Sequence, residues 1–337
     1  MVLAGPGTGK TRTLTYRLAH LMAEGIARSD QILAITFTNK AAEEMRSRVA
    51  QFGGELQTSS PPWISTFHGF CYRFLQENSP VPGQLLSEQE ALALLKKTVR
   101  KKVADFPAQS FKELARRISL IKNAWSPSET PQSLPPWDTY PNWPSLYQAY
   151  QKDLADQKFW DFDELLIQAV SLLERNPDLQ GVWQSRFPYL FIDEFQDINS
   201  IQYRLFQLLT REDGQWMVIG DPNQSIYGFR GASANFFDRL RRECPSLTEV
   251  HLTETFRLNQ TILTASSLVL EGSSLNRSIP LISSRKGEPQ VPIAALSRAE
   301  EEGEYIARVI EEEIGGLDFL AKGQGQDKQR SFADFAV

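Results

Sequence analysis

Residues 4–11 of the chain, AGPGTGKT, restrict its fold more than any other stretch. Closely spaced glycines let a loop turn its backbone N–H groups towards phosphate oxygens, with a lysine beside them and a threonine hydroxyl placed for Mg²⁺. A strand must precede such a loop, and the helix after it adds its positive N-terminal end to the site. The strict pattern has glycine where Ala4 stands, so the match is to a relaxed form. The sequence predicts an α/β fold with a phosphate site formed by Ala4, Gly5, Pro6, Gly7, Thr8, Gly9, Lys10 and Thr11.

Three apolar, β-rich segments agree with this fold: 32–37, 189–193 and 216–221. Continuous apolar runs of this length are typical of parallel strands that are covered on both faces. Helical patterns lie between and after them, at 10–23, 39–51, 67–77, 201–210 and 260–270. Alternating strands and helices predict a parallel sheet whose functional residues follow the carboxyl ends of its strands.

Composition limits the class of protein. At 337 residues, with 41% hydrophobic and 23% charged residues, the chain has room for two or three compact units. No apolar run approaches the ~20 residues of a membrane-spanning helix, and Cys71 and Cys244 are too few for a disulfide framework. We therefore expect a cytoplasmic protein with no membrane partner. A net charge of −5 excludes a uniformly basic surface, so a nucleic acid would need a local groove.

The pattern of predicted secondary structure changes twice along the chain. From 81 to 178 helical patterns surround a loop rich in Pro and Trp, and no convincing strand appears. We expect a helical subdomain inserted into an α/β domain formed by 1–80 and 179–277. A new pattern begins at 278, with a possible strand at 290–296, a helix at 299–314 and a strand-like end at 332–337. Trp125, Trp137 and Trp143 are expected to pack the loop rather than face a ligand.

The segment LFIDEFQD (190–197) supplies the acids that a phosphate loop needs. Asp193, at the end of an apolar strand, is placed to bind Mg²⁺ through water, and Glu194 to polarise an attacking water. Paired acids after a strand are more often a solvated strand end. Their occurrence together with the phosphate loop favours a catalytic role.

Three further stretches make a family resemblance specific: 35–49 (ITFTNKAAEEMRSRV), 65–70 (STFHGF) and 220–232 (GDPNQSIYGFRGA), followed by LTETFRLN at 252–259. With the phosphate loop and DEFQD they resemble, in order, the motifs of superfamily 1 DNA helicases of the UvrD/Rep type. The resemblance implies two RecA-like motor domains that bind ATP in their cleft and move along single-stranded DNA from 3′ to 5′. DNA at single-strand/double-strand junctions would be the substrate; protein partners are not indicated.

The resemblance also implies roles for single residues. Lys10 and Thr11 would serve phosphate and Mg²⁺, while Gln224 and Arg257 would reach the γ-phosphate. Arg12 is a weaker phosphate candidate, and Phe256 would lie on the adenine face where the family often has Tyr. For DNA, stacking and backbone contacts are indifferent to base identity. The candidates are Phe37, Thr66, His68, Tyr227, Phe229 and Arg230, with Phe229 standing where the family often has Trp. Phe37 could instead belong to the core, and His68 could cap a helix.

Several family motifs are not found in the sequence. The glutamine-containing adenine motif would precede residue 1, and the later motifs of the second motor domain would follow Val337. We therefore expect a fragment that is inactive as a helicase alone. Two alternatives remain open: a non-motor DNA-binding module modulated by ATP, and the motor part of a helicase–nuclease of the RecB/AddA type. A generic P-loop kinase would explain neither 35–49 nor 220–232.

Overall fold

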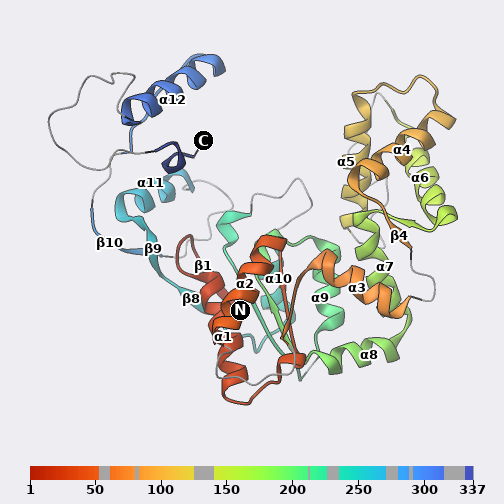
Figure 1. Cartoon of the computed structure of the whole chain (residues 1–337), viewed down its shortest axis with the longest axis horizontal. Helices are drawn as coiled ribbons and strands as arrows, with labels where there is room; N and C mark the ends of the chain where they lie inside the picture. Colours follow the sequence, from red (N-terminus) through yellow and green to blue (C-terminus); the bar gives the residue numbers. More distant parts are fainter. Residues whose placement is uncertain are drawn as a thin grey trace. The chain divides into compact units, whose positions relative to one another are not determined.

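The structure is a computed structural model. It describes residues 1–52, 61–79, 83–124, 140–211, 213–225, 235–270, 280–287, 291–314 and 331–336. The chain divides into two compact units, Met1–Glu288 and Pro289–Val337. Figure 1 shows the course of the chain through both units, which are described separately below.

A six-stranded parallel sheet forms the centre of the first unit. Its strand order is β3-β2-β6-β7-β1-β8. The strands are β1 (Val2–Ala4), β2 (Ile32–Thr36), β3 (Trp63–Thr66), β6 (Tyr189–Ile192), β7 (Gln215–Gly220) and β8 (Val250–Leu252). The parallel α/β fold predicted from the sequence is confirmed, and the three expected strands are β2, β6 and β7.

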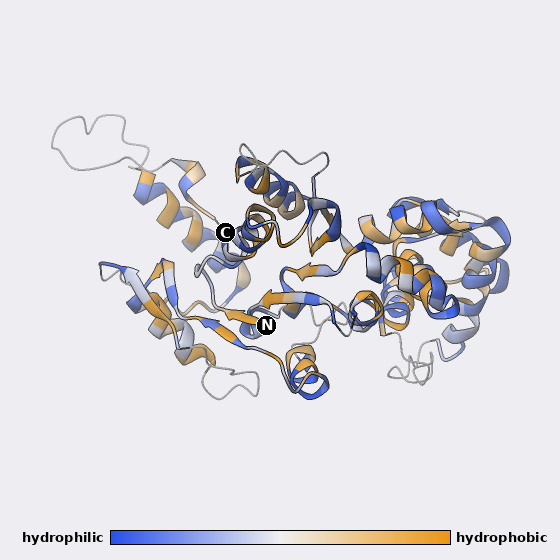
Figure 2. Cartoon of the chain, turned by 90° about the horizontal axis from the view of Figure 1, so that it is seen from below, coloured by the Kyte–Doolittle hydropathy of each residue, from blue (hydrophilic) through white to orange (hydrophobic). Residues whose placement is uncertain are grey.

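Two hydrophobic cores cover the two faces of this sheet. Successive strand residues point to opposite faces, so Leu33 and Ile35 of β2 join one core while Ile32 and Ala34 join the other. The smaller core contains α1 (Lys10–Ala23) and α2 (Asn39–Phe52). The larger one contains α3 (Phe67–Asn78), α7 (Phe162–Arg175), α8 (Pro177–Arg186), α9 (Ser200–Leu209) and α10 (Asn235–Glu243). Central strands are accordingly orange along much of their length in Figure 2.

Three helices between β3 and β6 have a core of their own. They are α4 (Glu88–Lys102), α5 (Ser110–Ala124) and α6 (Trp143–Gln157). Ser87 and Glu90 form a capping box that fixes the start of α4. Two strands of two residues each, β4 (Gln84–Leu85) and β5 (Phe159–Trp160), pair in parallel beside these helices. No strand was expected from 81 to 178, and this prediction is wrong for these four residues.

Trp143 is buried in this third core, which confirms the packing role predicted for it. Trp125 and Trp137 lie outside the described residues.

The remaining elements follow β8. The first unit continues with β9 (Glu254–Asn259), α11 (Gln260–Leu270) and β10 (Ile282–Arg285), and β10 pairs with β9 in parallel. The second unit contains α12 (Ala299–Ile314), which presents separate hydrophobic and hydrophilic faces (Figure 2). None of the described helices combines the length and apolarity required to span a bilayer.

Two expected strands near the C-terminus are wrong. Residues 291–296 form no strand, and Phe332–Asp334 is a short 3-10 helix, η6. Pro292 lacks an N–H for a strand ladder, and Ile293 is 94% exposed. A β-rich composition without a neighbouring strand does not suffice for strand formation.

Candidate functional site

The loop between β1 and α1 has the backbone that phosphate binding requires. Gly7 and Gly9 have φ values of 74° and 88°, in the left-handed region. Thr8 closes the turn by donating its hydroxyl hydrogen to the Gly5 carbonyl at 2.8 Å. Ala4 ends β1 fully buried, so a small residue fits there. Because α1 begins at Lys10, its free N–H groups face the same loop.

A second segment, distant in sequence, supports this loop. The Thr255 hydroxyl of β9 donates to the Pro6 carbonyl at 2.8 Å, and the Phe256 N–H donates to the Gly7 carbonyl at 3.0 Å. A Cβ atom on Gly7 would lie 2.7 Å from the Thr255 hydroxyl and would overlap the Arg257 side chain. Gly7 is therefore required by both its backbone conformation and this close approach. The contact also brings Arg257 to the phosphate loop.

Asp193 follows β6 directly and is buried next to the loop. Its N–H donates to the Ile35 carbonyl of β2 at 2.9 Å, and its carboxylate accepts the Thr11 hydroxyl at 3.1 Å. Burial, reinforced by the neighbouring Glu194 carboxylate, raises the pKa of Asp193 to about 6. The ionised form of this acid therefore lacks sufficient compensating positive charge.

Glu194 faces the loop lysine. Its carboxylate lies 3.7 Å from the Lys10 Nζ. The backbone of Glu194 is left-handed, with φ of 51°, and among the described non-glycine residues only Lys158 shares this feature. A conformation that costs free energy persists only where the surroundings enforce it. The strained turn directs the carboxylate into the cavity beside Lys10.

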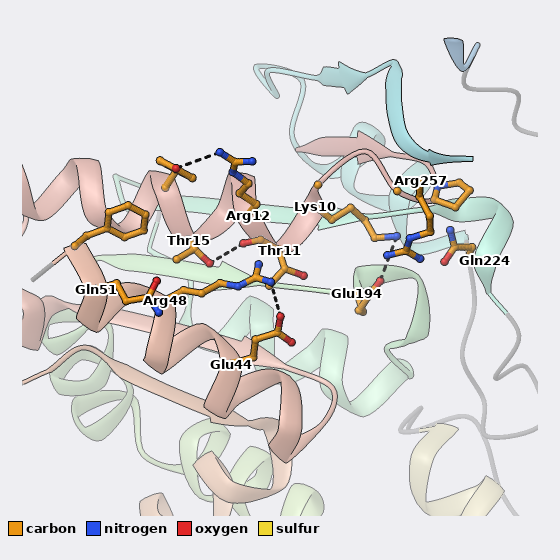
Figure 3. A pocket seen from close by; sticks show the side chains of 15 residues that line it. Lys10, Thr11, Arg12, Thr15, Glu44, Arg48, Gln51, Glu194, Gln224 and Arg257 are labelled. Carbon is orange, nitrogen blue, oxygen red and sulfur yellow. Dashed lines mark hydrogen bonds and ion pairs between the residues drawn. The ribbon is translucent and has the colours of Figure 1, made fainter. Parts of the chain in front are cut away.

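A cavity of about 590 Å³ collects these residues. At one end Lys10, Glu194, Gln224 and Arg257 direct their side chains towards one another (Figure 3). Gln224 belongs to a 3-10 helix, η4 (Pro222–Gln224), which follows β7. Its amide donates to the Asp221 carboxylate at 2.7 Å. The carboxyl ends of β6 and β7 thus supply groups to a single cavity.

The residues beside the loop fit a magnesium ion. Mg²⁺ is usually bound by one or two carboxylates together with substrate phosphates and water, rather than by an all-protein cage. Thr11 and Asp193 provide one hydroxyl and one carboxylate in contact with each other. Within the described ranges there is no cluster of three or more His, Cys, Asp or Glu that could hold a metal. The donor set is that of a metal shared with a phosphate ligand.

The other end of the cavity lies between α1 and α2 and was not foreseen from the sequence. It is lined by Arg12, Tyr16, Arg48 and Phe52, among others. The Tyr16 and Phe52 rings are 4.9 Å apart, and Arg12 lies over the Tyr16 ring at 5.2 Å. Arg48 is held by an ion pair with Glu44 (Figure 3). Phe256, expected at the adenine, is 61% exposed and does not line this cavity.

Two of the predicted DNA-binding residues line a second cavity of about 580 Å³. Phe37, at the end of β2, and His68, in the first turn of α3, both line it. Burial lowers the pKa of His68 to about 4, so its ring is uncharged at neutral pH. Phe162, the first residue of α7, also lines the cavity, and its ring meets His68 edge-on at 5.9 Å. Phe162 is not among the predicted DNA-binding residues, although it lies in the stretch FWDFDELL (159–166).

Those predicted DNA-binding residues that the structure describes lie in different structural surroundings. Thr66 caps α3, because its side chain accepts the Gly69 N–H at 3.1 Å. The capping function considered for His68 therefore belongs to Thr66. Phe37 is half-buried and is a member of none of the three cores. Tyr227, Phe229 and Arg230 lie outside the described residues.

Comparison with known proteins agrees with this geometry. Residues 1–245 match the model of the UvrD/REP helicase N-terminal domain. The chain is 31% identical over 315 residues to the ATP-dependent DNA helicase PcrA of Staphylococcus epidermidis, covering 92% of this chain and 43% of the relative. It is 34% identical over 294 residues to DNA helicase II of Escherichia coli, covering 81% and 38%. The chain thus spans about two fifths of the length of these relatives. Since the family match extends over most of its residues, the chain belongs to the UvrD/REP helicase family.

Proposed function

We propose that this chain is the ATP-binding part of a DNA motor, which couples ATP hydrolysis to movement along single-stranded DNA and to unwinding. The observation that carries the proposal is the convergence of Lys10, Glu194, Gln224 and Arg257 on one cavity beside a phosphate loop. The family resemblance supports 3′-to-5′ movement, action at single-strand/double-strand junctions and a cytoplasmic location. Residues 1–80 and 179–277 would form the first motor domain, 81–178 the helical subdomain and 278–337 the start of a second motor domain.

Each side chain in and beside the cavity has a proposed task. Lys10 and the loop N–H groups bind the phosphates. Thr11 and Asp193 would hold Mg²⁺, which would supply positive charge beside the phosphate oxygens. Glu194 orients and deprotonates the attacking water, while Gln224 and Arg257 contact the γ-phosphate. Arg12 is a further candidate for a phosphate contact, and Phe256, which lies outside the cavity lining, is proposed to lie on the adenine face.

The DNA strand is proposed to pass over the second cavity. Phe37 and Phe162 would stack on bases, contributing on the order of 1–3 kcal/mol per base without reading the sequence. His68, uncharged at neutral pH, and Thr66 would contact bases or backbone, and Tyr227, Phe229 and Arg230 would complete the strand site. Substituting Phe162 by Ala should weaken binding of oligothymidylate about tenfold or more. Tyr72→Ala, which removes a similarly exposed ring on α3, is the matched control.

Nucleotide chemistry is tested by titration with a fluorescent ATP analogue and by single-turnover hydrolysis, both with Mg²⁺. Lys10→Ala should weaken binding at least tenfold, whereas Lys152→Ala, on an exposed face of α6, should bind like the original chain. Glu194→Gln should bind normally but hydrolyse about 10²–10⁴-fold more slowly, the usual contribution of a general base. Undiminished turnover in Glu194→Gln would indicate a nucleotide-modulated binder instead of a motor.

Strand separation requires more of the motor than nucleotide binding does. An arginine finger contributes about 10³–10⁵ in rate, and the family places one in a later motif. The chain spans only about two fifths of the length of its relatives. These 337 residues on their own should therefore bind ATP weakly, show little DNA-stimulated turnover and fail to unwind a tailed duplex. Robust unwinding by this chain would contradict the proposed division of the motor.

A further inference from the structure

A buried glutamine joins the two strand ends that supply the nucleotide cavity. Gln196 lies in the 3-10 helix η3 (Phe195–Asp197) after β6, and it is 1% exposed. Its amide nitrogen donates to the Glu194 carboxylate at 2.8 Å and to the Asp197 carboxylate at 3.3 Å. Its amide oxygen accepts the Asp221 N–H at 2.9 Å. Donor and acceptor of one neutral side chain are thus both in use.

The second strand end is tied to the same residue more than once. The Asp221 carboxylate accepts the Gln224 amide at 2.7 Å and the Asn223 N–H at 3.0 Å. Ser225 donates its hydroxyl hydrogen to the main-chain carbonyl of Gln196 at 3.1 Å. These bonds hold the turn that carries Gln224 against the turn that carries Glu194.

The last residue of β7 leaves space for this arrangement. A Cβ atom on Gly220 would overlap the Gln196 amide oxygen and would lie 3.0 Å from the Phe237 ring. Glycine is therefore required where β7 passes the buried amide. The buried amide of Gln196 therefore packs directly against the end of β7.

Glu194 has a competing partner if this support is removed. Its backbone is strained, and Lys10 lies only 3.7 Å from its carboxylate. A closer pair between these two side chains would take both away from the nucleotide. The amide of Gln196 donates to Oε2 of Glu194, the same oxygen that lies nearest to Lys10, and so competes with Lys10 for it.

We propose that Gln196 is a positioning residue. It fixes the Glu194 carboxylate and the Gln224 turn relative to each other, so that both point to the same γ-phosphate. The inference rests on the proposed ATP hydrolysis and adds to it a residue that does not line the nucleotide cavity. Gln196 affects the rate of hydrolysis and the recognition of the third phosphate. It does not affect the affinity for ADP.

The test compares Gln196→Met, which keeps the volume of the side chain and removes its hydrogen bonds, with Gln196→Glu, which keeps the acceptor for Asp221 and removes the donor to Glu194. Gln184→Met is the matched control, because its amide also donates two hydrogen bonds, to the carbonyls of Leu208 and Thr210, and none of these residues lines the nucleotide cavity. We measure Kd for Mg-ATP and Mg-ADP and the single-turnover rate of hydrolysis.

Both Gln196 variants should hydrolyse ATP about 10–100-fold more slowly, since displacements of about 1 Å can cost 10²-fold. In Gln196→Met the preference for ATP over ADP should fall ~3–10-fold while the Kd for ADP stays within about twofold. The rate of Gln196→Met combined with Glu194→Gln should equal that of Glu194→Gln alone. Unchanged rate and preference, or strictly multiplicative rate losses, would overturn the proposal.

Unfolding separates failure of this inference from failure of the proposed function. A double-mutant cycle between Gln196→Met and Glu194→Gln in urea unfolding requires no nucleotide, and contacting residues typically couple there. We expect their effects on the unfolding equilibrium to be non-multiplicative by ~3–10-fold. If the original chain binds no nucleotide, the ATP proposal is wrong. If the cycle shows no coupling, the positioning role of Gln196 is wrong.

Discussion

Gly7 is required by two independent physical constraints, which a matched pair of substitutions separates. Gly7 and Gly25 both have positive φ, 74° and 64°, but a Cβ on Gly25 would meet nothing within 4 Å. Alanine costs roughly 1–2 kcal/mol in the left-handed region, and overpacking costs about 1–3 kcal/mol in addition. We predict that Gly25→Ala loses about 1 kcal/mol in the free energy of unfolding, while Gly7→Ala loses about 2–4 kcal/mol and binds ATP at least tenfold more weakly.

Urea unfolding and titration with the fluorescent ATP analogue measure these effects. Equal urea midpoints for the two variants, with unchanged ATP affinity in Gly7→Ala, would show that β9 does not press on the phosphate loop.

Asp193 destabilises the metal-free fold at neutral pH. Its pKa of about 6 lies above the ordinary 3.8, so the folded chain holds a proton that the unfolded chain has released. The resulting cost appears as the pH rises from about 4 to about 6 and is fully present above that. About two units correspond to roughly 3 kcal/mol as an upper value. We predict that Asp193→Asn is more stable than the original chain by about 1–3 kcal/mol at pH 7.5 without Mg²⁺.

The gain should vanish as the pH approaches 4, where both chains carry a neutral side chain at this position. Urea unfolding at several pH values, with EDTA present, follows the difference. Asp30→Asn serves as the control, because the hydrogen bond from Arg28 lowers the pKa of Asp30. A gain in Asp193→Asn that persists at pH 4, or an equal gain in Asp30→Asn, would contradict the explanation.

A buried ionic network joins α5 and α6 to the start of α7. The Lys122 ammonium, with a fully buried side chain, lies 2.7 Å from the Asp161 carboxylate and 3.2 Å from that of Glu164. Tyr150 of α6 donates to Asp161 at 3.0 Å. Burial disfavours the charge on Lys122, but Asp161 and Glu164 outweigh it and raise the pKa of the ammonium. Buried charges thus link α5, α6 and the start of α7.

Lys122→Met should therefore destabilise the fold by about 3–5 kcal/mol, because it leaves two buried carboxylates without their cation. Lys152→Met, which breaks an exposed ion pair with Asp156 at 2.7 Å, should cost at most about 1 kcal/mol. Thermal or urea unfolding of the two variants decides the question. Similar losses in both would show that Lys122 contributes no more than a surface charge.

Elements built on local pattern were predictable, and contacts between strand ends were not. Apolar runs locate β2, β6 and β7 because burial on both faces demands such runs. The chemistry of a phosphate loop implied that Asp193 lies beside Thr11. The bond from Gln196 to Asp221, in contrast, depends on β6 and β7 being neighbours. Likewise, the contact of Thr255 with Pro6 joins residues 249 positions apart. Periodicity in the sequence encodes neither neighbour relation.

The nucleotide site should be self-sufficient within the first unit. The three cores of described residues end at Leu252, and the described lining of the nucleotide cavity ends at Arg257. A chain of residues 1–288 should therefore unfold cooperatively and bind the fluorescent ATP analogue with a Kd within about twofold of the 337-residue chain.

A shorter chain of residues 1–245, the span of the family match, is the informative comparison. It lacks β8, which pairs with β1, and β9, which bonds the phosphate loop. Its affinity for the nucleotide should be at least tenfold weaker. Equal affinity in the two shortened chains would contradict the assigned role of β9.

The parallel ladder of β4 with β5 has a consequence for how such a chain can be rebuilt. The Leu86 N–H donates to the Trp160 carbonyl at 2.8 Å, and the Gln84 N–H to the Lys158 carbonyl at 2.9 Å. Residues 84–85 and 159–160 therefore lie on neighbouring parallel strands, about 4.8 Å apart. Residues 86–158 thus form an insert whose two ends are held together by this short parallel ladder. Because this ladder already holds the two ends of the insert together, a change in the length of the insert alters the loop-closure entropy only slightly. The β4–β5 ladder is therefore a suitable place for exchanging or grafting modules.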